Sequence, residues 1–429
     1  MAVKDDPRSH GLWEASAPPP PHTSALRGEL SVDVAVIGAG FTGCSAALHL
    51  AEGGADIAVL EAEEIGFGGS GRNVGLVNAG MWVMPDDLPA ALGETHGERL
   101  LRLLGDAPRT VFELVERHGI ACEVERQGTL HCAVGTKGLA ELRERERQWR
   151  ARGAPVRLLD ARETAAKVGT SAYAGALWDE RAGTIQPLAY VRGLAQAAIT
   201  AGARMFTSSP AVSAADEGRE WRLHTPNGVV RARRVVVATD AYARGIWPEV
   251  RREQVHLPYF NMATPPLDEA LRRSILPERQ GAWDTREILS SFRFDRQGRL
   301  VFGSVGALRG PGHAIHRDWG QRALAKLFPQ LRGIGFEYLW YGQIGMTENS
   351  LPRFHKLGRD VISFSGYNGR GIAPGTVFGR CLADLMLGRI GEADLPLPVT
   401  PAEDVRHRAL REAYYDVGAQ VAHFAGARV

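Results

Sequence analysis

The sequence predicts an α/β fold that begins with a nucleotide-binding βαβ unit and continues into an α+β part with a mixed or antiparallel sheet. Three observations support this prediction. A short β-branched run at residues 34–37 is followed by a glycine-rich turn, a helix and a second strand at 56–60. A second strand, glycine loop and helix follow at residues 361–387. Between them, residues 253–303 contain strands without intervening helices, a pattern typical of antiparallel or mixed sheets.

The first glycine-rich turn fits the G-x-G-x-x-G pattern of a Rossmann-like dinucleotide site. Gly38 would permit the tight turn, Gly40 would let a pyrophosphate approach the backbone, and Gly43 would let the helix pack on the strand. The N-terminus of the helix offers N–H groups and a positive dipole end to phosphates. Glu61 follows Gly43 by 18 residues, where an acid binds ribose hydroxyls and disfavours NADP. The alternative is a glycine-rich turn of another α/β fold.

Length and composition restrict the class of protein. The 429 residues predict two or three domains, and the net charge of +2 gives no indication of a nucleic-acid partner. No run approaches 18 apolar residues and no apolar segment follows the N-terminus, so neither a transmembrane helix nor a signal peptide is expected. The four cysteines form no CxxC or CxxH pattern, so we expect reduced thiols in a cytoplasmic protein and no metal site.

The other elements follow from hydrophobic periodicity and turn signals. Residues 1–30 are a lead-in with a stiff proline run, in which Trp13 could pack on the main body. Residues 62–80 are rich in glycine and are predicted to form a loop close to a ligand. Helices are expected at 97–119, 137–152, 187–201 and 376–387, and strands at 123–134, 174–178, 203–207, 221–225, 229–232, 234–239, 253–264, 288–294, 299–303 and 361–365.

Five segments together resemble the FAD-dependent D-amino-acid-oxidase-like superfamily over nearly the whole chain. They read VAVIGAGFTG, EAEEIGFGGSGRN, RRVVVATDAY, GRLVFGS and SGYNGRGIAPGTVFGR. The resemblance implies a discontinuous FAD-binding domain, residues 1–86, 157–247 and 341–429, and a substrate-binding domain, residues 87–156 and 248–340. It also implies hydride transfer to flavin N5 from the carbon next to an amine, which gives an imine.

The resemblance also implies which residues contact FAD. The loop at 366–373 would direct N–H groups and a helix dipole at the N1–C2 carbonyl edge of the flavin, where the reduced form is anionic. Val212 would contact adenine through its backbone. The predicted cofactor-binding residues are Gly38, Ala39, Gly40, Phe41, Thr42, Gly43, Glu61, Ala62, Ser70, Gly71, Arg72, Asn73, Val74, Gly75, Leu76, Val212, Ala238, Thr239, Gly342, Gly366, Tyr367, Asn368, Gly369, Arg370, Gly371, Ile372 and Ala373.

Two departures from the family pattern bear on the cofactor and the electron acceptor. Sarcosine oxidases attach flavin to a cysteine before the C-terminal glycine motif, but residues 340–354 contain none, so noncovalent FAD is expected. Those enzymes also promote oxygen reduction with a lysine at the position we align with Val301. Fast oxygen use is therefore in doubt, and a quinone or another carrier is an open alternative to O₂.

The motifs GRNVGLVNAGMW, GYNGRG and QGAWDTREILSS are most similar to bacterial L-pipecolate oxidases, so the leading prediction is oxidation of L-pipecolate to a tetrahydropyridine carboxylate. Oxidation of γ-glutamylputrescine or a polyamine is the second prediction, and a sarcosine- or D-amino-acid-oxidase-like activity is the third. An arginine in the pocket would favour a carboxylate substrate, and an acid would favour a polyamine. A non-catalytic flavin-binding sensor and a nicotinamide-dependent dehydrogenase are the remaining alternatives.

An amino-acid substrate requires a carboxylate clamp, for which the paired N–H donors of arginine are best suited. Arg293 is the candidate, against the alternative of a surface arginine. Tyr259 could donate a hydrogen bond to the substrate, Trp340 and Met346 could form an apolar wall for a six-membered ring, and His256 could act as a base. Each of these four residues could equally belong to the core.

Overall fold

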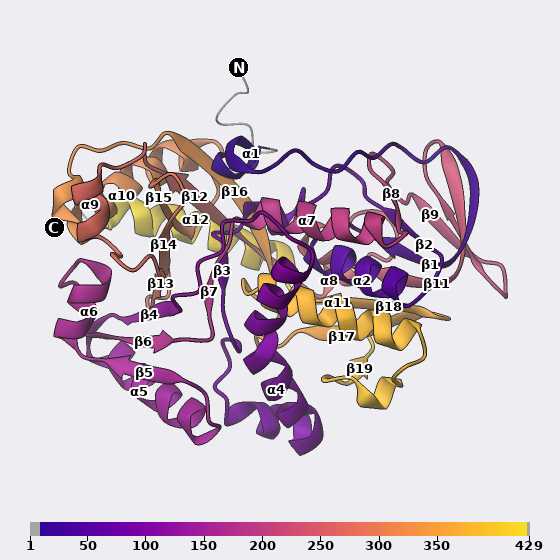
Figure 1. The fold of residues 1–429 in the computed structure, drawn as a ribbon, viewed down its shortest axis with the longest axis horizontal. Coiled ribbons are helices and arrows are strands. Elements are labelled where there is room, and N and C mark those ends of the chain that lie inside the picture. The colour runs from indigo at the N-terminus through magenta and orange to yellow at the C-terminus, as the bar shows by residue number, and fades with distance from the viewer. Residues whose placement is uncertain (1–8, 427–429) are drawn as a thin grey trace.

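The computed structural model describes residues 9–426, whose strands form two large sheets and one small one (Figure 1). The helices are α1 (Leu12–Ser16), α2 (Phe41–Glu52), α3 (Gly69–Arg72), α4 (Asp87–Arg117), α5 (Gly135–Ala151), α6 (Ala161–Val168), α7 (Pro187–Thr200), α8 (Glu249–Arg252), α9 (Glu269–Ser274), α10 (Pro311–Leu327), α11 (Ile372–Met386) and α12 (Arg408–Ala425). The strands are β1 (Gly28–Ile37), β2 (Ile57–Leu60), β3 (Leu76–Val77), β4 (Thr129–Ala133), β5 (Val156–Leu159), β6 (Gly175–Asp179), β7 (Gly183–Thr184), β8 (Arg204–Phe206), β9 (Ser213–Asp216), β10 (Trp221–His224), β11 (Gly228–Val237), β12 (Val255–Ala263), β13 (Gly281–Asp284), β14 (Ser290–Phe294), β15 (Leu300–Val305), β16 (Tyr338–Met346), β17 (Arg353–Gly358), β18 (Val361–Ser365) and β19 (Val399–Thr400).

The nine-stranded sheet has the order β19-β17-β18-β11-β1-β2-β8, and β9 and β10 form an antiparallel extension on β11. Its central pairs, including β1 with β2 and β11 with β18, are parallel, as the βαβ prediction requires. Helix α2 packs between α11 and α7. Strand β1 begins at Gly28, earlier than predicted, because residues 28–32 pair with the first residues of β11. The lead-in therefore ends sooner than expected.

The eight-stranded sheet has the order β16-β12-β15-β14-β13-β4-β6-β5. Its pairs are antiparallel except for β13 with β4, so the prediction of a mixed sheet is confirmed. Strands β5 and β6 join this sheet, although the predicted boundaries place residues 157–179 in the FAD-binding domain. We therefore propose two discontinuous domains, one on each large sheet, with this segment assigned to the substrate-binding domain.

Other differences from the predicted elements have local causes. The Ser70–Asn73 segment forms the short helix α3 at Gly69–Arg72 instead of a loop. Helix α10 was not predicted, because its glycines lower the intrinsic helix propensity of the segment. The burial of Trp319 and Leu324 against the sheet stabilises this helix in the structure. Among residues 9–426, no helix is both long and apolar enough to cross a bilayer.

The N-terminal helix α1 is tied to the main body, as predicted for Trp13. The Trp13 side chain is fully buried, and its Nε1 donates to the carbonyl of Asn73 at 2.8 Å. Its ring lies 5.5 Å from the ring of Trp340 on β16. The segment around α1 therefore covers part of the eight-stranded sheet and holds the chain just beyond α3.

Candidate active site

A cavity of about 760 Å³ lies where the two large sheets meet. Ile37, Leu60 and Val237 line it, and each is the last residue of a strand in the nine-stranded sheet. Ligands of open α/β sheets bind at this carboxyl edge of the strands. The other wall comes from the eight-stranded sheet and includes Tyr259 and Gly342. The geometry therefore places a nucleotide edge and a second binding surface in one cavity.

The N-termini of α2 and α11 converge on this cavity. Gly40 and Gly371 are their N-cap residues, both line the cavity, and neither helix receives a side-chain cap. The hydroxyls of Thr42 and Tyr367 are hydrogen-bonded to one another and connect the start of α2 to the loop before α11. Two helix N-termini of this kind suit an anionic ligand such as a pyrophosphate or a reduced flavin.

Two glycines of the first motif meet steric demands of their own. Gly38 has a φ of +101°, which side chains other than glycine rarely adopt. A Cβ at Gly43 would lie 1.9 Å from the carbonyl oxygen of Gly38. The first glycine therefore forms the turn and the third lets helix α2 pack against it, as the sequence predicts.

Glu61 lines the cavity beside this turn. One carboxylate oxygen accepts from the Ala39 N–H at 2.7 Å, and the other accepts from the Glu63 N–H at 3.0 Å. Burial raises the pKa of Glu61 above its usual value. The backbone thus holds the Glu61 side chain at the position where the motif requires a ribose acceptor.

The segment around α3 connects the two walls of the cavity. The Ser70 hydroxyl accepts from the Phe41 N–H at 3.0 Å, which anchors α3 to the start of α2. The carbonyl of Arg72 accepts from Asn261 Nδ2 at 2.9 Å and from Trp340 Nε1 at 3.0 Å. Trp340 therefore positions the backbone of this segment and does not face the cavity.

The loop from Gly366 to Gly371 is fixed on the opposite side. Asn368, at a φ of +52°, accepts from Trp82 Nε1 through its carbonyl at 2.6 Å and from the Thr347 N–H through its side chain at 2.8 Å. Asp240 accepts from the Gly366 N–H at 2.8 Å, and burial raises the pKa of Asp240 to about 6. A glycine loop held at Gly366 and Asn368 presents a fixed backbone to a ligand.

Most of the predicted cofactor residues line the cavity, although their individual contacts stay predictions. Those that do are Gly38, Gly40, Phe41, Thr42, Glu61, Ala62, Ser70, Arg72, Asn73, Val74, Leu76, Ala238, Thr239, Gly342, Tyr367, Asn368, Gly369, Arg370, Gly371 and Ile372. Those outside the lining are Ala39, Gly43, Gly71, Gly75, Val212, Gly366 and Ala373.

Val212 is a correction to the predicted adenine contact. Its side chain is 55% exposed, and its N–H donates to the carbonyl of His224 at 2.8 Å, so the pairing of β9 with β10 uses that donor. The preceding residues, Pro210 and Ala211, line the cavity. The backbone that borders the nucleotide end therefore lies one or two residues earlier than predicted.

Of the predicted substrate residues, Tyr259 and Met346 line the cavity. The Tyr259 hydroxyl is hydrogen-bonded to the Ser291 hydroxyl at 2.7 Å. His256 lies outside the lining because alternate residues of β12 point to opposite faces, and Leu257 and Tyr259 occupy the cavity face. The His256 side chain thus lies on the face of β12 away from the cavity, which does not support a role as a base.

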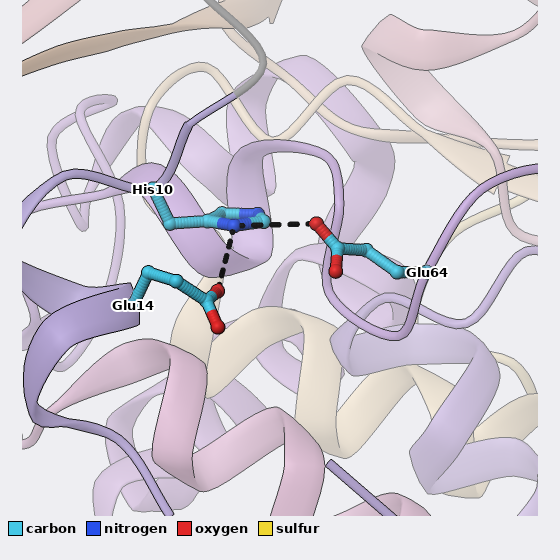
Figure 2. A group of neighbouring side chains, drawn as sticks. All are labelled: His10, Glu14 and Glu64. Carbon is cyan, nitrogen blue, oxygen red and sulfur yellow. Dashed lines mark ion pairs between the residues drawn. The ribbon is translucent and has the colours of Figure 1, made fainter. Parts of the chain in front are cut away.

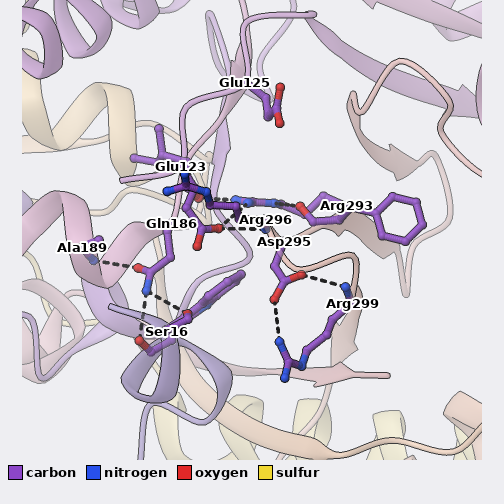
Figure 3. Close-up of polar contacts among 12 residues, drawn as sticks. Ser16, Glu123, Glu125, Gln186, Ala189, Arg293, Asp295, Arg296 and Arg299 are labelled. Atoms are coloured by element: carbon purple, nitrogen blue, oxygen red, sulfur yellow. Dashed lines mark hydrogen bonds and ion pairs between the residues drawn. The ribbon is translucent and has the colours of Figure 1, made fainter. Parts of the chain in front are cut away.

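Arg293 also lies outside the cavity, contrary to the predicted carboxylate clamp. Its side chain is 1% exposed, its Nε donates to the Phe294 carbonyl at 3.0 Å and its Nη1 donates to the Ile185 carbonyl. Figure 3 shows the guanidinium beside Glu123, with 4.0 Å between Nη2 and a carboxylate oxygen. The Trp13 ring centroid is 5.4 Å from the guanidinium carbon. Internal partners thus surround Arg293, which makes it a structural arginine.

The charged groups that do reach the substrate side were not predicted for that role. The Arg370 guanidinium lies 4.6 Å from the Trp82 ring and 5.7 Å from the Trp283 ring, and burial lowers the pKa of Arg370 to about 9. Arg286 and Glu287 line the cavity from the segment between β13 and β14. Further lining residues that the sequence did not indicate are Asn78, Tyr242, Arg244, Leu257, Leu289, Val305, Gln343 and Ile344.

The position aligned with the oxygen-promoting lysine lies in the core. Val301 is fully buried and does not line the cavity, whereas Val305, farther along β15, does. No lysine or cysteine lines the cavity within residues 9–426. All four cysteines are free thiols, and Cys381 is the one among them that is partly exposed.

A His–Glu cluster joins the N-terminal segment to the segment before α3. Figure 2 shows His10 between Glu14 and Glu64, with its Nδ1 3.4 Å and 3.5 Å from their carboxylate oxygens. The His10 Nε2 is 3.2 Å from the Gly66 carbonyl, and both oxygens of Glu14 accept from Arg192 at 2.9 Å. These contacts engage the side chains of His10 and Glu14 in the protein itself, so the cluster acts as a clamp.

Comparisons with known proteins agree with this geometry. Gamma-glutamylputrescine oxidoreductase of Escherichia coli strain K12 is 33% identical over 410 residues, which cover 91% of this chain and 94% of that protein. Glycine oxidase from Geobacillus kaustophilus superposes with a TM-score of 0.70 at 21% identity and covers 88% of this chain and 99% of its own. L-proline dehydrogenase from P. horikoshii superposes with a TM-score of 0.70 at 18% identity, over 91% of this chain and 97% of its own. The two superpositions show the fold.

Residues 33–385 match the family described as FAD dependent oxidoreductase. This span contains the glycine motif, Glu61 and the loop before α11, which together border the nucleotide side of the cavity. The uncapped helix N-termini and the conformation of the first motif fit the pyrophosphate and flavin of FAD. This chain is therefore a flavin oxidoreductase that belongs to the FAD-dependent D-amino-acid-oxidase family.

Proposed function

We propose that the enzyme oxidises an amine that also carries a carboxylate, with γ-glutamylputrescine as the leading substrate. Bound FAD supplies hydride-accepting chemistry at the carbon next to the amine, and the product is an imine. The protein residues bind the substrate, orient that carbon and exclude water from the site.

The observation that carries this proposal is the adjacent pair Arg286 and Glu287 at the cavity. The Arg286 side chain is 47% exposed and Glu287 is exposed, so both charges lie where the cavity meets solvent. The glutamyl head of γ-glutamylputrescine carries a carboxylate and an ammonium group on one carbon. The Nη1 atom of Arg286 lies 3.4 Å from an oxygen of the buried Asp284, so the guanidinium would pair with the carboxylate through its other donors. Glu287 would pair with the ammonium group. The relative from Escherichia coli, named for this substrate, supports the same choice.

The cavity walls between Arg286, Glu287 and the flavin side suit the putrescine part of γ-glutamylputrescine. Leu257, Leu289 and Val305 provide apolar surface for a four-carbon chain, and Tyr259 offers its hydroxyl beside Ser291. This uncharged surface would hold the extended carbon chain of the amine. The reactive amine would then lie beside the loop before α11.

L-Pipecolate is the second candidate, and Arg370 is the observation that favours it. The Arg370 guanidinium lies against Trp82 and Trp283 and belongs to the glycine loop itself. Burial disfavours its cation, so the carboxylate of a compact substrate would offset that cost. The two aromatic rings would then border a six-membered ring.

We further propose that FAD is held noncovalently and that an acceptor other than oxygen, such as a quinone, reoxidises it. Both proposals rest on the cavity lining, which has neither a cysteine nor a lysine among the described residues. A noncovalent flavin would be released by acid precipitation of the protein. Slow reoxidation in air, together with fast reoxidation by a soluble quinone, would support the second proposal.

The decisive experiment follows the flavin absorbance at about 450 nm under anaerobic conditions. The purified enzyme is mixed in turn with γ-glutamylputrescine, putrescine and L-pipecolate. We expect γ-glutamylputrescine to bleach the flavin rapidly and putrescine, which lacks the glutamyl head, to bleach it slowly. Bleaching by L-pipecolate alone would replace the leading substrate with the second candidate, and a flavin that none of the three reduces would reject both.

Two variants connect the substrate to the residues. Glu287→Gln keeps the size of the side chain but removes the charge, and we expect it to raise the half-saturating concentration of γ-glutamylputrescine about tenfold. The same variant should leave the half-saturating concentration of putrescine unchanged, because putrescine has no glutamyl α-ammonium group for Glu287 to bind. Equal effects on both amines would contradict the proposed contact.

A further inference from the structure

The C-terminal helix α12 has its polar side turned toward the protein. Glu412 accepts from the His256 N–H at 2.9 Å, and Asp416 pairs with Arg309 at 2.8 Å. The buried His423 stacks on Trp319, with 3.8 Å between ring centroids. Helix α12, drawn in yellow in Figure 1, thus packs on β12 and α10 largely through polar and aromatic groups. A helix that packs on its own protein normally buries an apolar stripe.

The apolar stripe of α12 faces outward instead. Its exposed fractions are 70% for Leu410, 72% for Tyr414, 59% for Val417, 63% for Val421 and 57% for Phe424. Their spacings alternate between four and three residues, which is the repeat of a helix–helix seam. The one other large hydrophobic side chain with comparable exposure outside α12, among residues 9–426, is Val212. The stripe therefore stands apart from the rest of the surface.

We infer that this stripe pairs with the same stripe of a second copy of the chain, in an antiparallel arrangement about a two-fold axis. A single outward seam on one helix is self-complementary under two-fold symmetry. The five side chains of each copy would together remove on the order of 1,000 Å² from water, close to the lower end of specific interfaces. The pairing thus provides an area that a stable dimer can use.

The flanks of the stripe favour a helix partner over a lipid surface. Ala413 and Gly418 border the stripe, and a Cβ at Gly418 would meet nothing within 4 Å, so another helix could approach closely. Helices that lie on membranes carry basic residues beside the apolar face. Here Arg411 is paired with Glu348 at 3.6 Å and the neighbouring flank positions are uncharged.

The order of residue sizes favours the antiparallel direction. With the axis between residues 415 and 416, Leu410 of one copy faces Val421 of the other, Tyr414 faces Val417, and Phe424 lies at each end of the seam. Each layer then combines a larger side chain with a smaller one, which packs without voids. In a parallel pair, two Tyr414 rings would face each other and two valines would leave a gap. The antiparallel direction also opposes the two helix dipoles.

Sedimentation velocity of the FAD-loaded full chain, over a roughly hundredfold concentration range, tests the inference. We expect a monomer–dimer equilibrium that Val417→Asp weakens at least about 100-fold, because it places carboxylates in two buried layers. Val212→Asp is the matched control and should leave the dimer intact. Leu410→Gln provides a second seam variant, and the flavin absorbance spectrum checks that each variant folds.

Mixed cysteine variants test the direction. Oxidation should link a Tyr414→Cys chain to a Val417→Cys chain faster than it links either chain to itself. Wild type, which has three buried cysteines and the partly exposed Cys381, serves as the background. Self-linking as the faster reaction would overturn the antiparallel arrangement. A monomer at every concentration, or a dimer that Val417→Asp does not weaken, would overturn the interface. Flotation of a monomer with phosphatidylglycerol vesicles, lost in Val417→Asp, would assign the stripe to a membrane surface instead.

Discussion

Replacing Arg293 with methionine should lower stability and leave substrate binding unchanged. The long apolar part of the side chain would remain beside Trp13, but the guanidinium would be lost. Its donors to the carbonyls of Ile185 and Phe294 would disappear, and Glu123 would lose a cation 4.0 Å away. The side chain is 1% exposed, so water cannot readily replace these contacts.

The size of the effect follows from those contacts. Each buried carbonyl left without a donor costs about 1–3 kcal/mol, and breaking a buried ion pair costs about 3–5 kcal/mol. The ion pair with Glu123 is long and the two costs overlap, so we expect the free energy of unfolding to fall by about 3–5 kcal/mol. The Michaelis constant of the surviving folded enzyme should stay within about twofold of wild type.

Denaturant unfolding of the two proteins, followed by steady-state kinetics with the best substrate, provides the measurement. Glu287→Gln is the matched control, because Glu287 is exposed at the cavity and should change the Michaelis constant without changing stability. An Arg293→Met enzyme of normal stability with a tenfold higher Michaelis constant would show that Arg293 contacts substrate. The structural interpretation of this residue would then be wrong.

Three further outcomes are expected. Glu61→Gln should weaken FAD binding about 10- to 100-fold in a fluorescence titration of the apoprotein, because a charged acceptor of the ribose is lost; unchanged affinity would contradict its role. Gly43→Ala should yield protein without flavin, since its Cβ would lie 1.9 Å from the Gly38 carbonyl; a normal flavin content would contradict that packing. Asp240 has a pKa raised from 3.8 to about 6, so the stability that its protonation provides is present below pH 4 and is lost as the pH rises through 6. Unfolding of wild type should therefore become easier by up to about 3 kcal/mol between pH 4 and 7 relative to Asp240→Asn, and parallel pH profiles of the two proteins would refute the shift.

The nucleotide side of the cavity was predictable because its determinants are local. Gly38, Gly43 and Glu61 lie within one βαβ unit, and the backbone conformation that each requires depends on neighbours in the sequence. The loop before α11 follows the same logic, since its glycines lie between a buried strand and a helix. Val212 differs because its donor is used by a hairpin partner, His224, which the motif does not specify.

Which residues line the substrate side of the cavity depends on the part of each strand that other segments cover. The alternation of residues along a strand does not contain that information. Ser291 and Arg293 lie on one face of β14 by alternation, and Met346 and Trp340 lie on one face of β16. In each pair the first residue lines the cavity and the second does not. The predicted Met346 thus lies at the cavity, whereas the predicted Arg293 and Trp340 lie on the same strand faces but too far along their strands.

Trp13 explains why both strands leave the cavity at the same end. Its ring lies against Trp340 and near the Arg293 guanidinium, so the N-terminal segment covers the part of the sheet on which these two side chains lie. The arginines that line the cavity are Arg72, Arg244, Arg286 and Arg370, and the last two are those that we propose for a substrate carboxylate. Since Trp13 also donates to the carbonyl next to α3, the segment that limits the substrate side also holds the loop that borders the flavin side. The residues before β1, which a motif search leaves unassigned, thus cover the ends of the strand faces that hold Arg293 and Trp340, while Ser291 and Met346 stay at the cavity.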